Sequence, residues 1–552
     1  MTSVKSRVAL LAFIFCSAFF IFELPSRSHA IQPTKVNIVT NRGDITRNNV
    51  NSQETTLNIS NVNPQDFGKL FTRPVVGDIY AQPLYVSDLA IPNQGTHDVV
   101  FVATAHNRVY AFDADDPEEV APLWEDDLGA PFTSNLALND IWDGEDGVLS
   151  TPVIDLASQT MYLVAHHDGS AATPPRTSAY HELHALDITT GAEKLGGPVM
   201  IQPSVKGTGW ASLNGTIALS SDKHLQRPGL LLLNGVVYIA FGSTGDQYPA
   251  HGWVVGYNAK DLTQTAVLNV TPAVGLGGIW QGGSGIASDG TNIYISTGNG
   301  SYDGRTDYGD SVIKLDEALK ILDWFTPSNE CYLNTYDKDL GSTGPLVIPG
   351  TNQIMAGSKQ GMLYILNQAN VGKYVPNQPC DVEGDPEDNP QIPESVMVGN
   401  GAMFSMPIYW NSRLVGPVLF TWTSRDVARS FPLVNGLIPV PLQPLSEGKD
   451  SSHGTPGDTL TLSSNGDEPG SALLWGSQVS AECTHCGVLR AWDATDLTKQ
   501  VWSSDMNAAR DSYGIVAKFN PPTVANGKVY MGTFSNRLDV YGLLQDHVSY
   551  TP

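Results

Sequence analysis

The chain has 552 residues, of which 31 are Lys or Arg and 56 are Asp or Glu, so its formal net charge is −25 at pH 7. A surface this acidic argues against nucleic acid and anionic membranes as partners. The sequence holds 53 Gly and 36 Pro residues, which suits many short strands and turns rather than long helices. We therefore expect an almost all-β protein.

The first 30 residues have the pattern of a secretory signal peptide. Lys5 and Arg7 give a charged start, residues 8–22 form an apolar run, and Ser28-His29-Ala30 offers small residues at the usual cleavage positions. The apolar run is too short for a comfortable membrane span, and no later stretch comes close. We expect residues 1–30 to be removed and residues 31–552 to form one secreted domain, extracellular or periplasmic.

Residues 99–124 contain the clearest copy of a repeat. An apolar strand ends in a small polar turn, a second strand alternates apolar and polar residues, and Asp113 opens a turn before Leu123-Trp124. Seven weaker copies follow, and seven of the eight align on one turn residue: Asp113, Asp187, Asn258, Asp316, Asn367, Asp493 and Gly542. A unit of about four strands repeated many times is typical of a β-propeller blade, because one blade cannot bury both of its faces alone.

The last copy lacks the Leu-Trp element that closes the repeat. It stops at Leu543-Leu544, whereas a similar element, Phe67-Gly68-Lys69-Leu70-Phe71, precedes the first copy. The sequence therefore predicts an eight-bladed β-propeller closed by an N-terminal strand, in which residues 67–72 pair with the last blade near residues 529–543.

Four cysteines follow the signal peptide, and an even number in an exported protein predicts disulfide bonds with three possible connectivities. We expect a local bridge between Cys483 and Cys486 and a second bridge between Cys331 and Cys380. The Cys483-x-x-Cys486 segment lacks the trailing His of a c-type haem attachment site.

Several histidines lie close together in the second repeat copy, at positions 166, 167, 181 and 184. They could bind a metal, but histidines scattered in β-turns are usually surface residues, and we interpret them as such.

The stretch from residue 277 to residue 361 carries polar chemistry at strand ends, at Trp280, Asn299, Asp337, Asp339 and Lys359. Each residue also has an ordinary interpretation. The Trp could simply pack, and Gly298-Asn299-Gly300 could be a tight turn or a glycosylation sequon. The two aspartates would share a face of a strand, where like charges need a cation or a raised pKa. They could also be a solvated acidic turn, with the Lys merely neutralising its neighbours.

The repeat and the order of these residues resemble the quinoprotein alcohol dehydrogenases, eight-bladed propellers that use pyrroloquinoline quinone (PQQ). In that family a Trp under the quinone precedes a calcium-binding Asn at a spacing close to the nineteen residues between Trp280 and Asn299. The family's Trp-Asp-x-Asp motif matches Tyr336-Asp337-Lys338-Asp339, and its Arg or Lys beside the quinone oxygens matches Lys359.

Two features depart from the family pattern. The gapless counterpart of a calcium-binding Glu is Gln247, with Asp246 beside it. A neutral amide removes one charge from a Ca²⁺ site, whose affinity depends on ligand charge. The chain also has no adjacent Cys-Cys pair, which the family uses to cap the quinone.

The resemblance implies a PQQ- and Ca²⁺-dependent dehydrogenase that oxidises the hydroxyl of an alcohol or a sugar, with Asp337 as the base. The candidate residues are Asp337 and Asp339 for catalysis, Trp280 and Lys359 for the quinone, and Asn299, Asp337, Gln247 and Asp246 for Ca²⁺. The rival hypothesis is a non-enzymatic propeller that binds a protein or a glycan, because function does not follow from fold.

Overall fold

The computed structural model describes residues 35–544 except 134–141, 173, 177, 377–378, 455–457, 482 and 484. The expected signal peptide lies outside the described residues, and the compact unit begins at Lys35. Strands dominate this unit, and its two α-helices are the short α1 (Glu330–Thr335) and α2 (Ala508–Asp511). None of the helices in the described part of the chain is long and apolar enough to cross a membrane.

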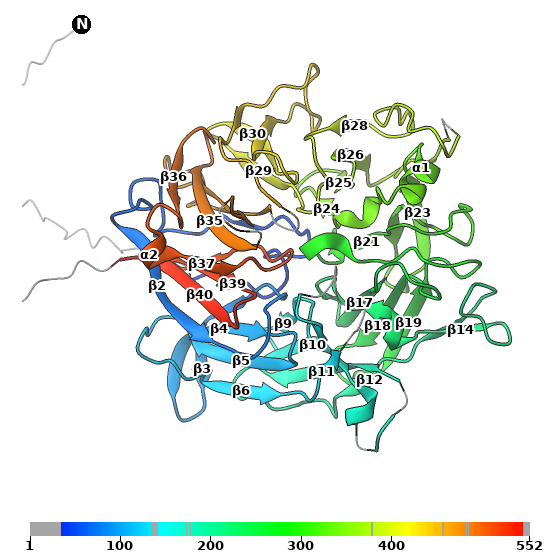
Figure 1. Cartoon of the computed structure of the whole chain (residues 1–552), viewed down its shortest axis with the longest axis horizontal. Helices are drawn as coiled ribbons and strands as arrows, with labels where there is room; N and C mark the ends of the chain where they lie inside the picture. The colour runs from blue at the N-terminus through cyan, green and yellow to red at the C-terminus, as the bar shows by residue number, and fades with distance from the viewer. Residues whose placement is uncertain are drawn as a thin grey trace, which may run out of the picture. The chain divides into compact units, whose positions relative to one another are not determined.

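Eight antiparallel sheets follow one another around a ring, which confirms the eight-bladed β-propeller (Figure 1). Blade one consists of β3 (Leu84–Ile91), β4 (Gly95–Ala103), β5 (Arg108–Asp113) and β6 (Trp124–Asp127), and blade two of β9 (Val153–Asp155), β10 (Thr160–His167), β11 (Tyr180–Asp187) and β12 (Val199–Met200). Blade three consists of β15 (His224–Leu225) and β16 (Leu231–Leu233) with β17 (Val236–Ser243), β18 (Trp253–Asn258) and β19 (Gln264–Asn269). Blade four consists of β20 (Ala287–Ser288), β21 (Ile293–Ser296), β22 (Val312–Leu315) and β23 (Ile321–Thr326), to which β27 (Lys373–Tyr374) adds in parallel.

Blades five to eight complete the ring. Blade five consists of β24 (Leu346–Val347), β25 (Gln353–Gly357), β26 (Met362–Asn367) and β28 (Glu394–Met397), and blade six of β29 (Ile408–Ser412), β30 (Gly416–Thr421), β31 (Arg429–Pro432) and β32 (Ser446–Glu447). Blade seven consists of β33 (Thr459–Ser463), β34 (Leu473–Val479), β35 (Cys486–Asp493) and β36 (Gln500–Ser503), joined by β1 (Val50–Asn51) and β37 (Tyr513–Ile515). Blade eight consists of β38 (Thr523–Ala525), β39 (Lys528–Gly532), β40 (Arg537–Leu543) and β2 (Phe67–Pro74). Two small hairpins lie between blades: β7 (Phe132–Thr133) with β8 (Glu145–Asp146), and β13 (Ser204–Lys206) with β14 (Thr216–Ala218).

Each repeat copy of the sequence forms the two middle strands of one blade. In the first copy, alternate residues of β4 and β5 enter two different cores because successive side chains point to opposite faces of a strand. Val99, Phe101 and Ala103 join the core shared with blade two. Val100 and Val102 join the core shared with blade eight. Burial of both faces explains why these strands are apolar over most of their length.

The N-terminal strand closes the ring as predicted. β2 pairs with β40 in antiparallel register, with Phe67 opposite Leu543, and in Figure 1 the blue β2 lies beside the red β40. The Phe67 ring packs against Trp502 at a centroid distance of 5.0 Å and against Trp475 at 5.5 Å. The last blade therefore takes one of its four strands from the start of the chain.

Residues 38–51, which we call the inner belt, contact all eight blades in chain order. The backbone of Ile38 pairs with Tyr85 of blade one, and further along, Asn48 hydrogen-bonds to Tyr409 of blade six. The other contacts join Val39 to Ile154, Thr40 to Leu230, Ile45 to Ser288, Thr46 to Val347, Asn49 to Leu462 and Asn51 to Val524. The belt thus runs once around the inside of the ring and bonds to the innermost strand of each blade or the turn before it.

Two arginines of the inner belt are completely buried. Arg47 donates hydrogen bonds to the carbonyl oxygens of Leu230 and Ile286, both at 2.9 Å, and Arg42 donates to the carbonyl oxygen of Arg47 at 2.9 Å. Burial lowers the pKa of Arg42 to about 9 and that of Arg47 to about 10. Carbonyls of blades three and four therefore replace the water that the Arg47 guanidinium loses. The Arg42 guanidinium is satisfied instead by the carbonyls of Arg47, Met406 and Pro407.

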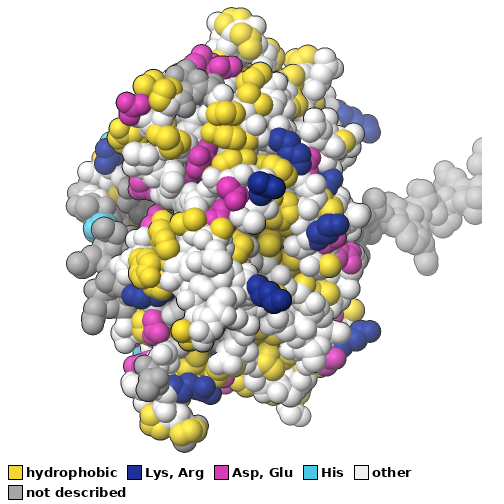
Figure 2. Space-filling view, turned by 90° about the vertical axis from the view of Figure 1, so that its right-hand side faces the viewer, with side chains coloured by type: hydrophobic (Ala, Val, Ile, Leu, Met, Phe, Trp, Pro, Cys, Tyr) yellow, Lys and Arg dark blue, Asp and Glu magenta, His cyan; other side chains and the backbone are white. Residues whose placement is uncertain are grey.

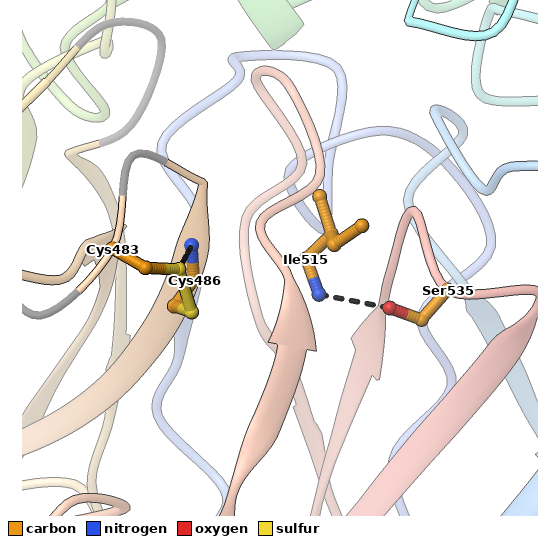
Figure 3. The surroundings of a disulfide bond; sticks show 4 residues. All are labelled: Cys483, Cys486, Ile515 and Ser535. Atoms are coloured by element: carbon orange, nitrogen blue, oxygen red, sulfur yellow. Dashed lines mark hydrogen bonds between the residues drawn. A yellow bond between two sulfur atoms is a disulfide. The ribbon is translucent and has the colours of Figure 1, made fainter.

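Both predicted disulfides are present, with Cα–Cα distances of 4.8 Å for Cys331–Cys380 and 5.4 Å for Cys483–Cys486. Figure 3 shows the second bridge at the start of β35, beside β37, where Ile515 donates its N–H to the hydroxyl of Ser535 at 2.9 Å. The Cys483 Sγ also accepts the N–H of Cys486 at 3.0 Å.

The interpretation of the second-blade histidines as surface residues is wrong. His166 and His167 end β10, His181 and His184 lie on β11, and all four are buried. Each blade of a closed ring packs against a neighbour on both of its faces. Neither set of alternating side chains on its inner and middle strands therefore faces solvent.

Charged side chains are spread over the side of the ring shown in Figure 2. Lys and Arg side chains lie singly there, with acidic side chains among them.

Candidate functional site

Six of the predicted residues come together on one face of the ring, at the junction of blades three, four and five. They lie in the turns that follow β17, β21 and β25, and in the two connections that lead to β20 and β24. Corresponding turns of adjacent blades lie at the same face of a propeller, so residues more than 100 positions apart meet. The six are Asp246, Trp280, Asn299, Asp337, Asp339 and Lys359, which we call the mouth cluster.

Asp339 is the buried centre of the mouth cluster. Its Oδ2 accepts a hydrogen bond from the indole Nε1 of Trp280 at 2.7 Å, and its Oδ1 lies 2.6 Å from the Lys359 ammonium. The same ammonium lies 5.3 Å from the centroid of the Trp280 ring. One carboxylate therefore fixes both the aromatic ring and the cation.

A glycine makes this contact possible. A Cβ on Gly298 would lie 2.6 Å from Asp339 Oδ2 and 3.0 Å from Trp280 Nε1. Contacts this short do not occur for real Cβ atoms, so any larger residue would separate the indole from the carboxylate. Gly298 is therefore a structural requirement of the site as well as part of the turn.

Asn299 joins two further carboxylates. Its Nδ2 donates to Asp337 Oδ1 at 2.9 Å and to Asp246 Oδ2 at 3.2 Å. Its Oδ1 is buried and has no hydrogen-bond partner among the described residues. Because Asn299 is itself buried, the folded chain does not offer it for glycosylation.

The two candidate catalytic aspartates have very different access to solvent. Asp337 follows helix α1 in a left-handed conformation, with φ of 54°, a conformation that is common just after a helix C-terminus. Its side chain is 69% exposed, although its Oδ1 lies 2.5 Å from Lys359. The side chain of Asp339 is 2% exposed. Of these two aspartates, only Asp337 can contact a molecule that arrives from solvent.

Burial dominates the electrostatics around these groups. It raises the pKa of Asp339, an effect that Lys359 partly offsets. The pKa of the wholly buried Asp310 lies well above its usual range, because of burial first and the neighbouring Asp339 second. Burial also raises the pKa of Glu330 to about 7. The acidic groups therefore outnumber the one cation of the mouth cluster, Lys359, whose pKa is raised by Asp339 and Asp337 despite its own burial.

Gln247 does not join the mouth cluster. Its backbone carbonyl accepts the N–H of Ala250 at 2.8 Å, and its side chain has no hydrogen bond to the cluster in the described part of the chain. Asp246 takes the place next to Asn299, held by the hydroxyl of Ser243 at 2.6 Å. The sequence named both residues as alternatives, and the geometry favours the aspartate.

Aromatic residues surround the indole of Trp280. Phe404 and Phe519 lie at centroid distances of 6.2 Å and 5.9 Å from it, and 5.7 Å from each other. Phe519 also borders a small cavity lined by Asn41 of the inner belt and Arg227 of blade three. The belt therefore lies beneath this part of the ring mouth.

Sequence reasoning missed Asp310, Ser243, Phe404 and Phe519. Asp310 accepts the N–H of Leu340 at 3.0 Å, and its second oxygen has no hydrogen-bond partner among the described residues. These residues stand in no motif that the sequence analysis used, and the two phenylalanines reach Trp280 from other blades.

The cluster fits a divalent cation better than it fits a quinone. The unpartnered Asn299 Oδ1 and the carboxylates of Asp246 and Asp337 supply the hard oxygen ligands that Ca²⁺ prefers. Trp280 presents an aromatic face, but Lys359 lies over that face, so a planar ring would have to displace or stack beside the ammonium.

Comparisons with known proteins agree on the fold. No family profile matches the sequence, and no curated protein matches it. Among solved structures, a europium-containing methanol dehydrogenase matches 93% of this chain and 99% of its own, with a TM-score of 0.59 and 11% identity. The quinohemoprotein alcohol dehydrogenase ADHIIG from Pseudomonas putida HK5 matches 92% of this chain and 80% of its own, with a TM-score of 0.58 and 12% identity. At such identities the likeness shows the propeller fold alone.

Proposed function

We propose that the protein is a quinoprotein-like dehydrogenase that oxidises the hydroxyl group of an alcohol or a sugar, with Ca²⁺ and PQQ as cofactors. The observation that carries the proposal is the mouth cluster, in which an indole, a lysine and four oxygen-bearing side chains from three blades meet as the sequence resemblance implies. The solved dehydrogenases with the same fold support it.

Asp337 is the residue we assign as base. A general base must come within hydrogen-bond reach of the proton that it removes, and Asp337 is the exposed carboxylate of the pair. It would take the substrate hydroxyl proton, and bound PQQ would supply the two-electron oxidant that receives the hydride equivalent. Asp339 is a positioning residue, because it is buried and acts through Trp280 and Lys359.

Ca²⁺ would bind between Asp246, Asn299 and Asp337. A cation at this place would give the Asn299 oxygen a partner and would compete with Lys359 for Asp337. Freed from Asp337, the ammonium would remain paired with Asp339 beside the Trp280 indole, where it would be available to hold the quinone.

One observation favours the rival function, a propeller that binds a protein or glycan partner. Lys359 already pairs with both Asp337 and Asp339, so the cluster contains an internal counter-ion. In such a protein the same contacts would serve only to hold three blades together at the ring mouth.

Export is also part of the proposal. Two disulfides join all four cysteines that follow the expected signal peptide, and disulfides persist in oxidising compartments. We propose that the protein works outside the cytoplasm.

Reconstitution tests the enzyme directly. The purified chain, stripped of metal with chelator, is given PQQ and Ca²⁺, and quenching of Trp fluorescence and reduction of an artificial electron-accepting dye are measured across simple alcohols and sugars. We expect quenching with both cofactors and dye reduction with at least one substrate. Neither binding nor turnover would leave the binding propeller as the better account.

The Asp337→Asn variant separates chemistry from binding. It should abolish dye reduction, because the base is lost, while far-UV circular dichroism and the thermal midpoint stay close to those of the parent since the side chain is exposed. Asp303→Asn is the control, because Asp303 lies in a surface turn of blade four and makes no contact with the mouth cluster. Turnover that survives Asp337→Asn would refute Asp337 as the base.

A further inference from the structure

The second blade carries a group of metal-binding side chains away from the mouth cluster. His167, Glu182 and His184 each offer a ligand atom, and these atoms lie within 4.8 Å of one another. His167 Nε2 and Glu182 Oε2 are 3.5 Å apart. Strand pairing explains the group: Glu182 stands opposite Ala165 and His184 opposite Leu163 on β10, so both share a face with His167.

Two ring nitrogens in this group lack a hydrogen-bond partner among the described residues. They are Nε2 of His167 and Nε2 of His184, and the two side chains are only 4% and 5% exposed. Buried polar atoms are nearly always hydrogen-bonded, so an unpaired one needs an explanation. A bound metal ion would satisfy both nitrogens at once.

The other nitrogen of His184 is held in the way that metal-binding histidines require. His184 Nδ1 lies 2.9 Å from Glu193 Oε2, and the second oxygen of Glu193 accepts the N–H of Ala185 at 2.7 Å. A carboxylate that accepts a hydrogen bond from Nδ1–H fixes the tautomer in which Nε2 is a free electron-pair donor.

We propose that His167, Glu182 and His184 form a Zn²⁺ site. Two imidazoles and one carboxylate are a known Zn²⁺ ligand set in which the fourth coordination position is left to water or an exchangeable ligand. Zn²⁺ ligand atoms in a tetrahedral arrangement stand about 3.3 Å apart, so the 3.5 Å separation of His167 and Glu182 already fits. Small rotamer changes would bring Nε2 of His184 to the same distance from the other two ligand atoms. The side chain of Glu182 is 20% exposed, which gives the ion a route from solvent.

The site lies against blade one. The segment before β7 pairs with His167 through Pro131, and Asp126 on β6 also lies near His184. Zn²⁺ there would add to the contact between the two blades. The site is separate from the proposed quinone chemistry and does not depend on it.

Zn²⁺ alone is the probe. The full-length mature chain is stripped with chelator and dialysed, Zn²⁺ is titrated against a chromophoric competitor, and bound metal is counted by mass spectrometry. We expect one Zn²⁺ per chain at this site and a rise in the thermal midpoint. Co²⁺ in its place should give the visible absorption of a four-coordinate ion. A wild-type chain that retains no Zn²⁺ would overturn the proposal.

The variants locate the ion. Glu182→Gln, which preserves shape, should weaken Zn²⁺ binding at least tenfold, and His167→Gln serves the same purpose should Glu182→Gln not fold. His97→Gln is the matched control, because both nitrogens of His97 already have partners in Asp113 and Gln94. Asp337→Asn tests whether the ion binds at the mouth cluster instead, and it should keep the Zn²⁺ affinity of the parent. Equal Zn²⁺ affinity in Glu182→Gln and the parent, or loss of the ion in Asp337→Asn alone, would refute this location.

Discussion

The indole of Trp280 donates its N–H to a carboxylate, Asp339 Oδ2, at 2.7 Å. The two residues stand 59 positions apart and belong to the connections before blades four and five. Because Asp339 also pairs with Lys359, this one contact links the aromatic ring of the mouth cluster to its only cation.

Trp280→Phe should therefore cost more than an ordinary lost hydrogen bond. The phenyl ring keeps much of the packing against Phe404 and Phe519, but Asp339 loses a donor in a buried place. A hydrogen bond to a charged group contributes about 1.5–3 kcal/mol, and we expect the free energy of unfolding in urea to fall by that amount. Trp324→Phe is the matched control: its Nε1 donates to the neutral hydroxyl of Tyr302 at 3.1 Å, and its loss should cost about 1 kcal/mol. Equal losses would contradict the charged character of the Trp280 contact.

Glu330 should make stability depend on pH. Burial raises its pKa from 4.5 to about 7, so between these values the folded chain binds more protons than the unfolded chain, and stability falls as pH rises. Glu330→Gln removes this cost. We expect the variant to be more stable than the parent by about 2–3 kcal/mol at pH 8 and equal to it near pH 4.

Urea denaturation of both proteins at several pH values measures the difference. The histidines that titrate in this range contribute equally to the stability of both proteins, so they cancel in the difference. One of them is His224, whose pKa burial lowers to about 4. The exposed Glu118→Gln is the control and should show no such pH dependence. A constant difference between Glu330→Gln and the parent across the range would contradict the assignment.

The inner belt should be essential for stability. Arg47→Met keeps the apolar stem but removes the guanidinium, which leaves the buried carbonyl oxygens of Leu230 and Ile286 without those donors. Each buried acceptor left unsatisfied costs about 1–3 kcal/mol, so for these two carbonyls we expect the free energy of unfolding to fall by about 2–6 kcal/mol. Arg413→Met, whose side chain is 92% exposed, should change it by less than about 0.5 kcal/mol. Equal effects would show that the belt does not hold the ring together.

The two disulfides should contribute unequally. Cys331 and Cys380 close a loop with a sequence separation of 49, and Cys483 and Cys486 one of 3. In the chain-entropy treatment, replacing the first pair by Ser should cost about 4 kcal/mol and replacing the second about 1.5 kcal/mol. Equilibrium unfolding of the two double variants under non-reducing conditions checks the order, and a larger loss for the Cys483 pair would reverse it.

The sequence predicts the parts of the fold that repeat. Apolar alternation around turn residues such as Asp113 identifies every blade, and the Leu-Trp element missing after Leu543 predicts the closing strand β2. The inner belt escapes this reasoning because its role is not periodic. Arg42 and Arg47 look like surface residues of a polar segment. Only the closed ring brings the carbonyl groups of blades three and four, and of the segment before blade six, around them.

The histidines of blade two show a second limit. The i, i+2 spacing of Glu182 and His184 places both on one face of a strand, and this signal was present in the sequence. What the sequence does not show is register: only the pairing of Glu182 with Ala165 brings His167 to the same place. For the mouth cluster, the family resemblance supplied the order of the residues, and all six members were named from the sequence. Asp310 and the two phenylalanines were not.

The last prediction concerns the cation at the mouth cluster. Ca²⁺ added to the metal-free chain should raise the thermal midpoint, because an ion that binds only the folded state stabilises it in proportion to RT ln(1 + [Ca²⁺]/Kd). Asp246→Asn should weaken this effect, since affinity depends on the charge of the ligands and Asp246 contacts Asn299 directly at 3.2 Å. Gln247→Glu adds a charge one residue away and should strengthen it if the new carboxylate turns towards Asn299. Asp261→Asn in a surface turn of blade three is the control and should leave the response unchanged. The same Ca²⁺ response in the parent and in Asp246→Asn would place the ion elsewhere, and no response in the parent would leave Lys359 as the only counter-ion of the cluster.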